Sequence, residues 1–452
     1  MSIHPFFAIL LDPGMGKTAI CLEDYRRKRN AFEVERALVV APLKTCYNVW
    51  PNEAKKWRAF RDLDIRVAHG TGKTVDNVNA AHITVINPEG LKWLIENSKK
   101  ILPFHSLYVD ESTLFKNPSS QRSRALFKLA HKINGGIPFR YLLTGTPAPN
   151  GVQDLFGQFK ILEPSILGDT LQKFRGDFCF SGRKTHWGFE WEPTKRSVEL
   201  IEQAIAPHSI RLAAEDHLDM PDKVLTERKV SLPPDVRKLY DELEKELFIF
   251  LDNGEIVASN AGVLTGKCRQ IANGAVYLSP DGEASITPTR RVEYLHQEKA
   301  KALIELYEEL GRKPLLVAYE FGHDLTTIKQ CIKKEYGFTP RYIGETTRNE
   351  DDQKLIEQWN NKELPLLLIN PAGASHGLNL QAGGHHICWY SLTWNLEHYI
   401  QLNDRLYRQG QPEGVFIHHL IAERTADEKV WKVLQRKDAT QLKLMNALKE
   451  IR

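Results

Sequence analysis

Four residues near the N-terminus have the types and the spacing of a phosphate-binding loop, namely Gly14, Gly16, Lys17 and Thr18. Glycines let successive backbone N–H groups turn around an anion, and the N-terminus of a following helix adds the positive end of its dipole. A lysine after the last glycine reaches the outer phosphates of a nucleotide, and the next hydroxyl can bind Mg²⁺. The sequence therefore predicts that residues 13–18 bind the phosphates of a nucleotide together with Mg²⁺: Pro13, Gly14, Met15, Gly16, Lys17 and Thr18.

The context of the loop favours this interpretation over a simple glycine-rich turn. Phe6–Leu11 is an apolar run with the length and content of a buried strand, and an amphipathic segment begins near Lys17. Leu11 stands where the usual pattern has Gly or often Ala, but the Gly-x-Gly-Lys-Thr core is intact. We therefore expect a strand, a glycine loop and a helix in this order.

An acidic pair, Asp110 and Glu111, ends a second apolar run in residues 106–110. An Asp at the end of a buried strand can hold Mg²⁺, usually through water, and an adjacent Glu can orient or deprotonate the attacking water. The alternative is an acidic turn at a helix N-terminus, which is common for an isolated pair. Because a phosphate loop precedes the pair in the same predicted sheet, we interpret it as part of a hydrolytic site.

The segment that must position these residues alternates apolar runs with helical stretches up to about Asn150, which predicts a parallel sheet with helices on both faces. The other runs are residues 37–42, 83–87 and 141–144. Polar residues or glycines follow each run. Because ligands of open α/β sheets bind at the carboxyl ends of the strands, we expect these turns to converge on the phosphate loop.

Length and composition are those of a soluble globular protein with two or three domains. The chain has 452 residues, of which 42% are hydrophobic and 26% charged. No apolar run approaches the roughly 18 residues of a membrane-spanning helix, and no signal peptide is recognisable. We therefore expect a cytoplasmic protein with no membrane contact. The net charge of +4 is compatible with a polyanionic partner.

The cysteines and histidines give no pattern of a disulfide framework or a metal site. The six cysteines are scattered without a Cys-x-x-Cys pair, which indicates reduced and mostly packed thiols. The pairs His385-His386 and His418-His419 lie in strand-like runs. Neighbouring residues of a strand point to opposite faces, so we do not expect either pair to chelate one metal ion.

The strand–helix alternation stops between Gly151 and about Glu298. Long amphipathic stretches at residues 198–206 and 236–251 predict helical protrusions and a crossing linker. One loop in this segment combines cations with an aromatic residue, which suits nucleic acid, although a solvated loop is an equal alternative. Its residues are Arg183, Lys184, His186 and Trp187.

A second alternating domain begins near Gln297 and has no phosphate loop of its own, which implies a nucleotide shared at a cleft. Arg405 and Arg408 are three residues apart, so we expect them on one face of a helix. Two guanidinium groups placed in this way could reach the γ-phosphate together. The alternative is a solvent-exposed basic helix face. The apolar runs of this domain are residues 314–319, 365–370, 386–390 and 415–421.

Several segments resemble the motifs of the Swi/Snf family of superfamily-two helicase-like ATPases. The most specific are Lys116-Asn117 after the acidic pair and Asn150 after Thr-Gly-Thr-Pro, which separate this family from DEAD-box proteins. Ser112-Thr113 departs from the usual Ala-His, which leaves the coupling of the second motif to the third open. The matching segments are Lys17-Thr18, residues 41–43 with Trp50 and Trp57, and residues 110–117, 143–150, 374–380, 394–395 and 401–411.

The resemblance implies an α/β fold of two RecA-like parallel-sheet lobes with a helical insertion and linker between them in the sequence. The lobes would span residues 1–150 and 299–452, and the insertion residues 151–298. It further implies a monomeric, DNA-dependent ATPase of compact bacterial or bacteriophage type that moves along double-stranded DNA without separating the strands. The implied roles are catalytic for Lys17, Asp110, Glu111, Arg405 and Arg408, metal-binding for Thr18 and Asp110, and nucleotide-binding for Gln401.

The expected contacts with nucleic acid lie at the edges of the two lobes. They are Lys44, Asn87, Thr146, Ser375 and Trp394. Two alternatives stay open: a strand-separating DNA or RNA helicase of the same superfamily, and a nucleotide-gated DNA scaffold with little hydrolysis. The second arises because only five residues precede Phe6, where the family has an adenine-reading Gln segment. Either the chain begins late, or adenine is held by other means.

Overall fold

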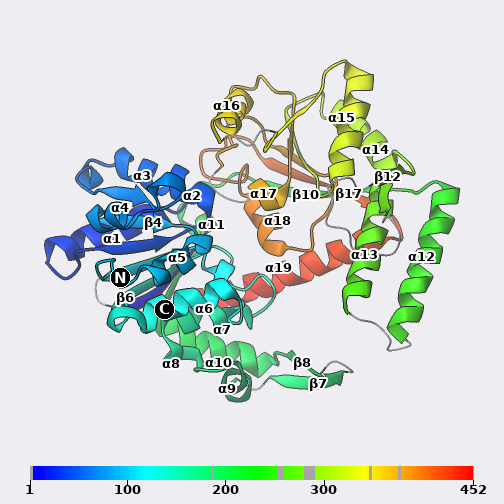
Figure 1. Ribbon diagram of the computed structural model, residues 1–452. Coiled ribbons are helices and arrows are strands. Elements are labelled where there is room, and N and C mark those ends of the chain that lie inside the picture. Colours follow the sequence, from blue (N-terminus) through cyan, green and yellow to red (C-terminus); the bar gives the residue numbers. More distant parts are fainter. Residues whose placement is uncertain are drawn as a thin grey trace. The chain divides into compact units, whose positions relative to one another are not determined.

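The chain divides into two compact units in a computed structural model that describes residues 4–178, 180–185, 188–252, 258–278, 291–345, 349–374 and 378–450 (Figure 1). Unit 1 comprises Met1–Leu218 together with Lys437–Arg452, and unit 2 comprises Asp219–Arg436. Helix α19 (Ala426–Glu450) begins in unit 2 and ends in unit 1.

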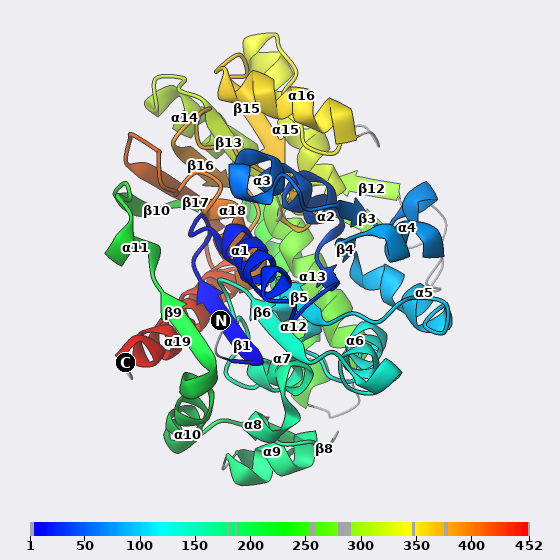
Figure 2. The ribbon, with the colours of Figure 1, turned by 90° about the vertical axis from the view of Figure 1, so that its left-hand side faces the viewer.

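Unit 1 is built on a seven-stranded parallel sheet with the strand order β3-β4-β2-β5-β6-β1-β9. Five strands lie in the apolar runs predicted from the sequence, whereas β3 and β9 were not predicted. In Figure 2, β9 lies beside β1 at one edge of the sheet. The strands are β1 (Phe6–Leu11), β2 (Ala37–Val40), β3 (Ile65–Val67), β4 (Ile83–Ile86), β5 (Ser106–Asp110), β6 (Phe139–Leu143) and β9 (Ser209–Leu212).

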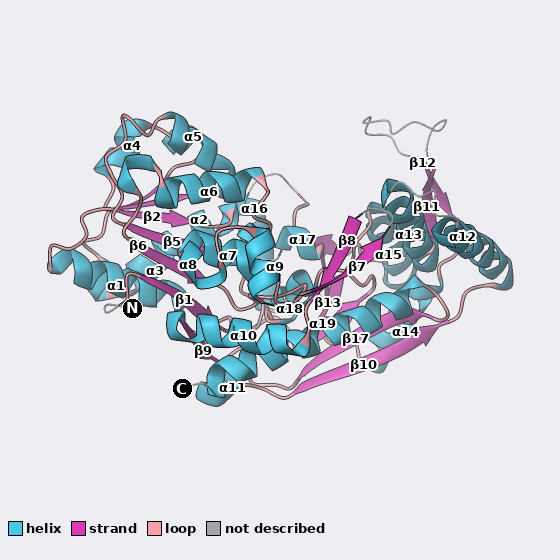
Figure 3. Ribbon diagram, turned by 90° about the horizontal axis from the view of Figure 1, so that it is seen from below, coloured by secondary structure: helices cyan, strands magenta, loops and turns pink. Residues whose placement is uncertain are grey.

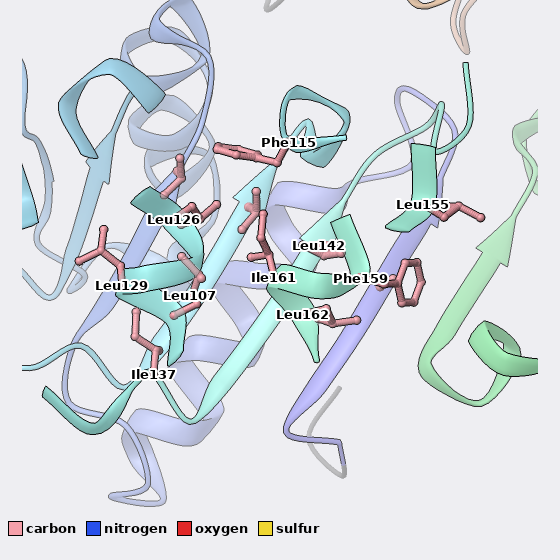
Figure 4. Close-up of a cluster of buried hydrophobic side chains, with 14 of the residues drawn as sticks. Leu107, Phe115, Leu126, Leu129, Ile137, Leu142, Leu155, Phe159, Ile161 and Leu162 are labelled. Atoms are coloured by element: carbon pink, nitrogen blue, oxygen red, sulfur yellow. The ribbon is translucent and has the colours of Figure 1, made fainter. Parts of the chain in front are cut away.

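Helices cover both faces of this sheet, because alternate strand residues enter two separate cores. Ala8 and Leu10 of β1 enter one core, and Phe7 and Ile9 enter the other. Figure 4 shows side chains of α6 and α7 packed on Leu107 of β5. One face carries α1 (Lys17–Asn30), α2 (Leu43–Asn48) and α3 (Trp50–Lys56), and the other α4 (Val75–Ala80), α5 (Leu91–Glu96), α6 (Gln121–His131) and α7 (Asp154–Leu162).

The remainder of unit 1 follows α7 in the chain. Thr194 and Ser197 form a capping box that starts α10, whose Ile201 and Ile205 enter the first core. Met445 of α19 enters the same core. The elements are α8 (Pro164–Leu167), α9 (Leu171–Asp177), the antiparallel pair β7 (Ser181–Thr185) and β8 (Gly188–Glu192), α10 (Lys195–Ile205) and α11 (Ala214–His217). The short 3₁₀ helices are η1 (Arg58–Phe60), η2 (Gly70–Gly72), η3 (Pro88–Gly90), η4 (Ser112–Phe115), η5 (Ile133–Gly135) and η6 (Ala206–His208).

Unit 2 contains a second parallel sheet, with the order β10-β17-β16-β13-β15-β14, so the predicted fold class is confirmed. Figure 3 shows its edge strand β10 alongside β17. The strands are β10 (Lys223–Val230), β13 (Leu315–Ala318), β14 (Arg341–Tyr342), β15 (Leu366–Ile369), β16 (His386–Trp389) and β17 (Val415–Ala422).

Helices again cover both faces of the sheet in unit 2. One face carries α14 (Glu298–Glu309) and α15 (Gly322–Tyr336), and the other carries α16 (Asn349–Asn360), α18 (Leu396–Asn403) and the start of α19. The other elements are α12 (Pro234–Asp252), α13 (Ala258–Asn273), the antiparallel pair β11 (Ala275–Leu278) and β12 (Arg291–Tyr294), and α17 (Pro371–Ala374). Among all the described helices, none has the length and apolar character needed to span a membrane.

Candidate active site

The predicted phosphate loop joins β1 to α1 in unit 1. Gly14 has φ 85° and Gly16 has φ 73°, a left-handed backbone that glycine adopts without strain. Helix α1 begins at Lys17, so the N–H groups of its first turn lie directly after the loop. The Nζ atom of Lys17 donates to the carbonyl oxygens of Leu11, at 2.8 Å, and Asp12, at 3.2 Å. The ammonium group therefore lies over the loop that would hold the phosphates.

The acidic pair lies at the carboxyl end of β5, two strands from β1 in the sheet. Asp110 is buried, and its Oδ2 accepts a hydrogen bond of 3.0 Å from Nε1 of Trp50 on α3. Glu111 has φ 53°, a left-handed conformation that costs a non-glycine residue about 1–2 kcal/mol. Such strain clusters at functional sites, because the surrounding structure must enforce it. The contact between Trp50 and Asp110 joins residues 60 positions apart and was not predicted from the sequence.

A buried glutamine connects the segment after the acidic pair with the Thr-Gly-Thr-Pro turn. Oγ of Ser112 donates to Oε1 of Gln158 at 2.7 Å, and Nε2 of Gln158 donates to the carbonyl oxygen of Pro147 at 2.7 Å. The same nitrogen also donates to the carbonyl of Asp154, one turn earlier in α7. Gln158 thus links the segment of Ser112-Thr113 to the Thr-Gly-Thr-Pro turn by hydrogen bonds. In the sequence, the only indication of this link is a single glutamine among apolar residues of α7.

Helix α7 packs closely against both the segment after the acidic pair and the Thr-Gly-Thr-Pro turn. A Cβ atom on Gly157 would lie 2.3 Å from the carbonyl oxygen of Lys116 and 2.6 Å from that of Phe115, so only glycine fits there. Asp154 accepts hydrogen bonds from the backbone N and from Nδ2 of Asn150, at 2.8 and 3.1 Å. The backbone of Lys116 therefore lies close against α7, and Asn150 is hydrogen-bonded to it.

The turn after β6 packs against the phosphate loop, as the sequence predicted for turns at this edge. A Cβ atom on Gly145 would lie 3.1 Å from Cδ of Pro13 and 3.2 Å from the carbonyl oxygen of Leu11. Thr144 accepts a hydrogen bond of 3.1 Å from the backbone N of Thr146, which closes the turn.

The expected nucleic-acid contacts of unit 1 differ in exposure. Lys44 is half-buried in the first turn of α2. Asn87 and Thr146 are buried, and Nδ2 of Asn87 donates to Oε2 of Glu89 at 2.6 Å. A nucleic-acid role of these three residues stays a prediction. His186 and Trp187 of the basic aromatic loop lie outside the described residues.

The two arginines of unit 2 do not lie on a helix, so that part of the prediction is wrong. Helix α18 ends at Asn403, and Arg405 and Arg408 follow in a hydrogen-bonded turn segment. Arg405 is buried, and its Nη1 donates to the carbonyl oxygen of Leu378 at 3.2 Å. Burial lowers the pKa of Arg408, and the nearby Asp404 opposes this effect. Arginine stays charged throughout the physiological range, so both side chains can act as cations.

The remaining expected contacts of unit 2 have separate surroundings. Gln401 is buried in α18, and its Nε2 lies 3.5 Å from Oε1 of Glu397. Trp394 is partly buried against the core of unit 2. Ser375 lies outside the described residues. Within the described part of the chain, no group of three or more His, Cys, Asp or Glu side chains could hold a metal ion.

Comparisons with known proteins identify the family. The model of the SNF2-related domain matches residues 8–276, and that of the helicase conserved C-terminal domain matches residues 298–410. The first match covers more than half of the chain. The chain therefore belongs to the SNF2-related family of helicase-like ATPases, and the resemblance seen in its motifs is confirmed.

Individual relatives extend over nearly the whole chain. A protein of Acyrthosiphon pisum secondary endosymbiont phage 1 is 34% identical over 455 residues, which cover 96% of this chain and 93% of the relative. The DNA annealing helicase and endonuclease of Mus musculus is 24% identical, and the match covers 97% of this chain but 39% of the relative. The Sulfolobus solfataricus SWI2/SNF2 ATPase core, solved in complex with dsDNA, is 23% identical with a TM-score of 0.42, over 98% of this chain and 90% of that one.

Proposed function

We propose that this chain hydrolyses ATP with Mg²⁺ when it is bound to double-stranded DNA, and that it moves along the duplex without separating the strands. The observation that carries the proposal is the phosphate loop of an SNF2-related chain, with Lys17 at the start of α1 and an acidic pair at the same edge of the sheet. An anion cradle next to paired carboxylates suits the hydrolysis of a nucleoside triphosphate.

In the proposed mechanism, the residues of unit 1 have separate roles in binding and hydrolysing the nucleotide. Backbone N–H groups around Gly14 and Gly16 hold the phosphates, and the ammonium group of Lys17 neutralises their outer charge. Glu111 orients the attacking water and accepts its proton, since its carboxylate follows directly on Asp110 in a strained backbone conformation. Gln158 keeps the segment after this pair in register with the Thr-Gly-Thr-Pro turn.

The chemistry of the nearby side chains fits Mg²⁺. The hydroxyl of Thr18 and the carboxylate of Asp110 are hard oxygen ligands, which this ion prefers. Trp50 donates to Oδ2 of Asp110 and so fixes the orientation of the carboxylate. Mg²⁺ held by these oxygens would supply positive charge against the negative charge that develops on the phosphates.

Arg405 and Arg408 of unit 2 would complete the site on the γ-phosphate, with Gln401 as a further contact to the nucleotide. Cations brought to the transferred phosphoryl group in this way are worth about 10³ to 10⁵ in rate. Hydrolysis would then depend on domain geometry, because the nucleotide is bound in one unit and the cations belong to another. A DNA duplex that favours the closed geometry would stimulate hydrolysis.

Two observations support the proposal that the chain moves along duplex DNA. The family-specific residues Lys116, Asn117 and Asn150 are present, and the relative from Mus musculus is named as a DNA annealing helicase and endonuclease. The contacts proposed for its backbone are Lys44, Asn87, Thr146, Ser375 and Trp394.

Phosphate release measured with duplex DNA, single-stranded DNA and RNA tests the proposal. We expect duplex DNA to give the largest stimulation of turnover. Stimulation by RNA or single strands alone would contradict it, and so would binding of DNA without hydrolysis, which is the behaviour of a scaffold.

Two displacement assays distinguish translocation from unwinding. We expect the protein to displace the third strand of a triplex and to leave a plain duplex paired. Separation of the plain duplex would show a strand-separating helicase instead.

A further inference from the structure

An ion pair between buried Arg211 and half-buried Asp12 joins the edge strand β9 to the first residue after β1. Nη1 of Arg211 lies 2.7 Å from Oδ1 of Asp12, with side-chain exposures of 7% and 26%. The same nitrogen donates to the carbonyl oxygens of Leu212, at 2.6 Å, and Leu10, at 3.2 Å. Arg211 thus contacts the backbone of both strands and the carboxylate of Asp12.

Asp12 also makes contacts with the phosphate loop and with the segment after β9. Its carbonyl oxygen accepts a hydrogen bond of 3.2 Å from Nζ of Lys17, the residue expected to reach the outer phosphates. Its Oδ2 accepts a hydrogen bond of 2.9 Å from the backbone N of Ala214, at the start of α11. One residue therefore connects the phosphate-binding lysine with the segment after β9.

That segment leads directly out of unit 1. Strand β9 ends at Leu212, α11 covers Ala214–His217, and unit 2 begins at Asp219. If Lys17 turns toward bound phosphates, as the proposed function requires, Asp12 would lose the contact at its carbonyl oxygen. Its remaining contacts, to Arg211 and Ala214, are then the path by which the change reaches the segment.

We propose that Asp12 and Arg211 are a positioning pair that transmits the nucleotide-bound state of the phosphate loop to residues 212–218, the segment leading into unit 2. The inference rests on the proposed binding of ATP by residues 13–18. It adds a route by which the bound nucleotide acts on the chain that joins the units. Coupling of this kind needs an element with two arrangements that both sites bias. In the inference this element is Lys17, which contacts the loop carbonyls in the arrangement seen here and would contact phosphates in the other.

Amide hydrogen exchange of residues 212–218 in the full chain tests the pair. In the wild type, we expect a non-hydrolysable ATP analogue with Mg²⁺ to change the exchange rate of this segment by about fivefold or more. Arg211→Met removes all three contacts of the guanidinium, so the response should disappear and the analogue should bind about tenfold more weakly. Arg211→Lys keeps the charge and should restore part of both.

Arg140 offers a matched control. It lies near the start of β6, at the amino-terminal ends of the strands, whereas the phosphate loop follows a carboxyl end. Its Nη2 lies 3.0 Å from Oε2 of Glu163, with exposures of 11% and 24%. It also donates to the carbonyl oxygens of Leu162 and Ile137. Arg140→Met should therefore cost similar stability but leave the exchange response and the analogue affinity unchanged.

The outcomes separate the inference from the function on which it rests. A wild type that fails to bind the analogue overturns the proposed function. A wild type that binds it, with Arg211→Met responding equally, overturns the positioning pair alone, and so does an equal loss of response in Arg140→Met. If Arg211→Met does not fold, Asp12→Asn decides, because it removes the charge and keeps the size of the side chain.

Discussion

At the scale of residues, the site depends on backbone conformations as much as on side chains. Gly14 and Gly16 adopt the left-handed backbone that the loop requires, while Glu111 adopts it at a cost. Asp110 is oriented by Trp50 and lies at the end of a fully buried strand. The turns proposed to bind phosphate and to activate water thus lie at the same edge of one sheet, with β6 between their two strands.

Lys17→Ala should remove ATP turnover and leave the fold intact. In the proposed site, Lys17 at the start of α1 neutralises the outer phosphates, and its Nζ donates to the backbone carbonyls of Leu11 and Asp12 in the loop itself. Phosphate release and a thermal melt measure the two effects. Lys92→Ala, at a side chain that is 86% exposed, is the control and should keep full activity. Retained turnover in Lys17→Ala would refute the site.

The residue types and their spacing were enough to predict the phosphate loop and the acidic pair, because both are local in sequence. The contacts of Trp50 with Asp110 and of Gln158 with Ser112 and Pro147 could not be predicted in this way. They join residues that are far apart in the chain, and only the packing of α3 and α7 on the sheet brings them together.

At the scale of elements, the sequence predicted central strands and missed edge strands. Strand β9 lies at an edge of the sheet in unit 1, and β10 and β14 are the two edge strands of the sheet in unit 2. These three strands are only partly buried. An edge strand has one neighbour, so it needs no continuous apolar run. The prediction that Arg405 and Arg408 lie on a helix failed for a similar reason. The spacing of the two arginines does not show that α18 ends at Asn403.

Gly157→Ala should destabilise unit 1 by about 1–3 kcal/mol, the usual cost of overpacking. The added methyl group would meet the backbone carbonyls of Phe115 and Lys116, which cannot turn away as a side chain could. Urea unfolding measures the loss. Gly176→Ala in α9 is the control, because its Cβ would meet no atom within 4 Å and alanine favours a helix. Equal stability of wild type and Gly157→Ala would contradict the packing described for α7.

Three buried histidines of β16 and β17 should make unit 2 less stable in acid. His386 contacts His418 at 3.2 Å, and His419 lies between Tyr399 and the carbonyl oxygen of Thr226. Burial lowers the pKa of His386 to about 3 and the pKa values of His418 and His419 to about 4.

The direction of the effect follows from proton binding. Below about pH 6.5 the unfolded chain binds protons that the folded chain does not, so the free energy of unfolding falls as the pH falls. Each histidine contributes at most about 1.4 kcal/mol per pH unit, between about pH 6.5 and its lowered pKa. Urea unfolding at pH 8, 6 and 5 measures this slope, and His386→Phe should reduce it. A free energy of unfolding that is constant over this range would contradict the prediction.

At the scale of the whole molecule, unit 1 contains the predicted phosphate loop, and unit 2, built on a second parallel sheet, contains Arg405 and Arg408. The family models match one after the other along the chain, with residues 8–276 followed by residues 298–410. The chain covers almost all of its phage relative but less than half of the relative from Mus musculus. The proposed motor therefore rests on features contained in these two units.

The central claim is that arginines of unit 2 act on a nucleotide bound by unit 1. It is tested most directly by Arg405→Ala, with analogue affinity and single-turnover hydrolysis measured at saturating duplex DNA. Arg312→Ala, at an exposed arginine of unit 2, is the control. We predict that Arg405→Ala binds the nucleotide as the wild type does but hydrolyses it about 10³-fold more slowly. Equal losses of binding and hydrolysis, or hydrolysis at the wild-type rate, would contradict the account.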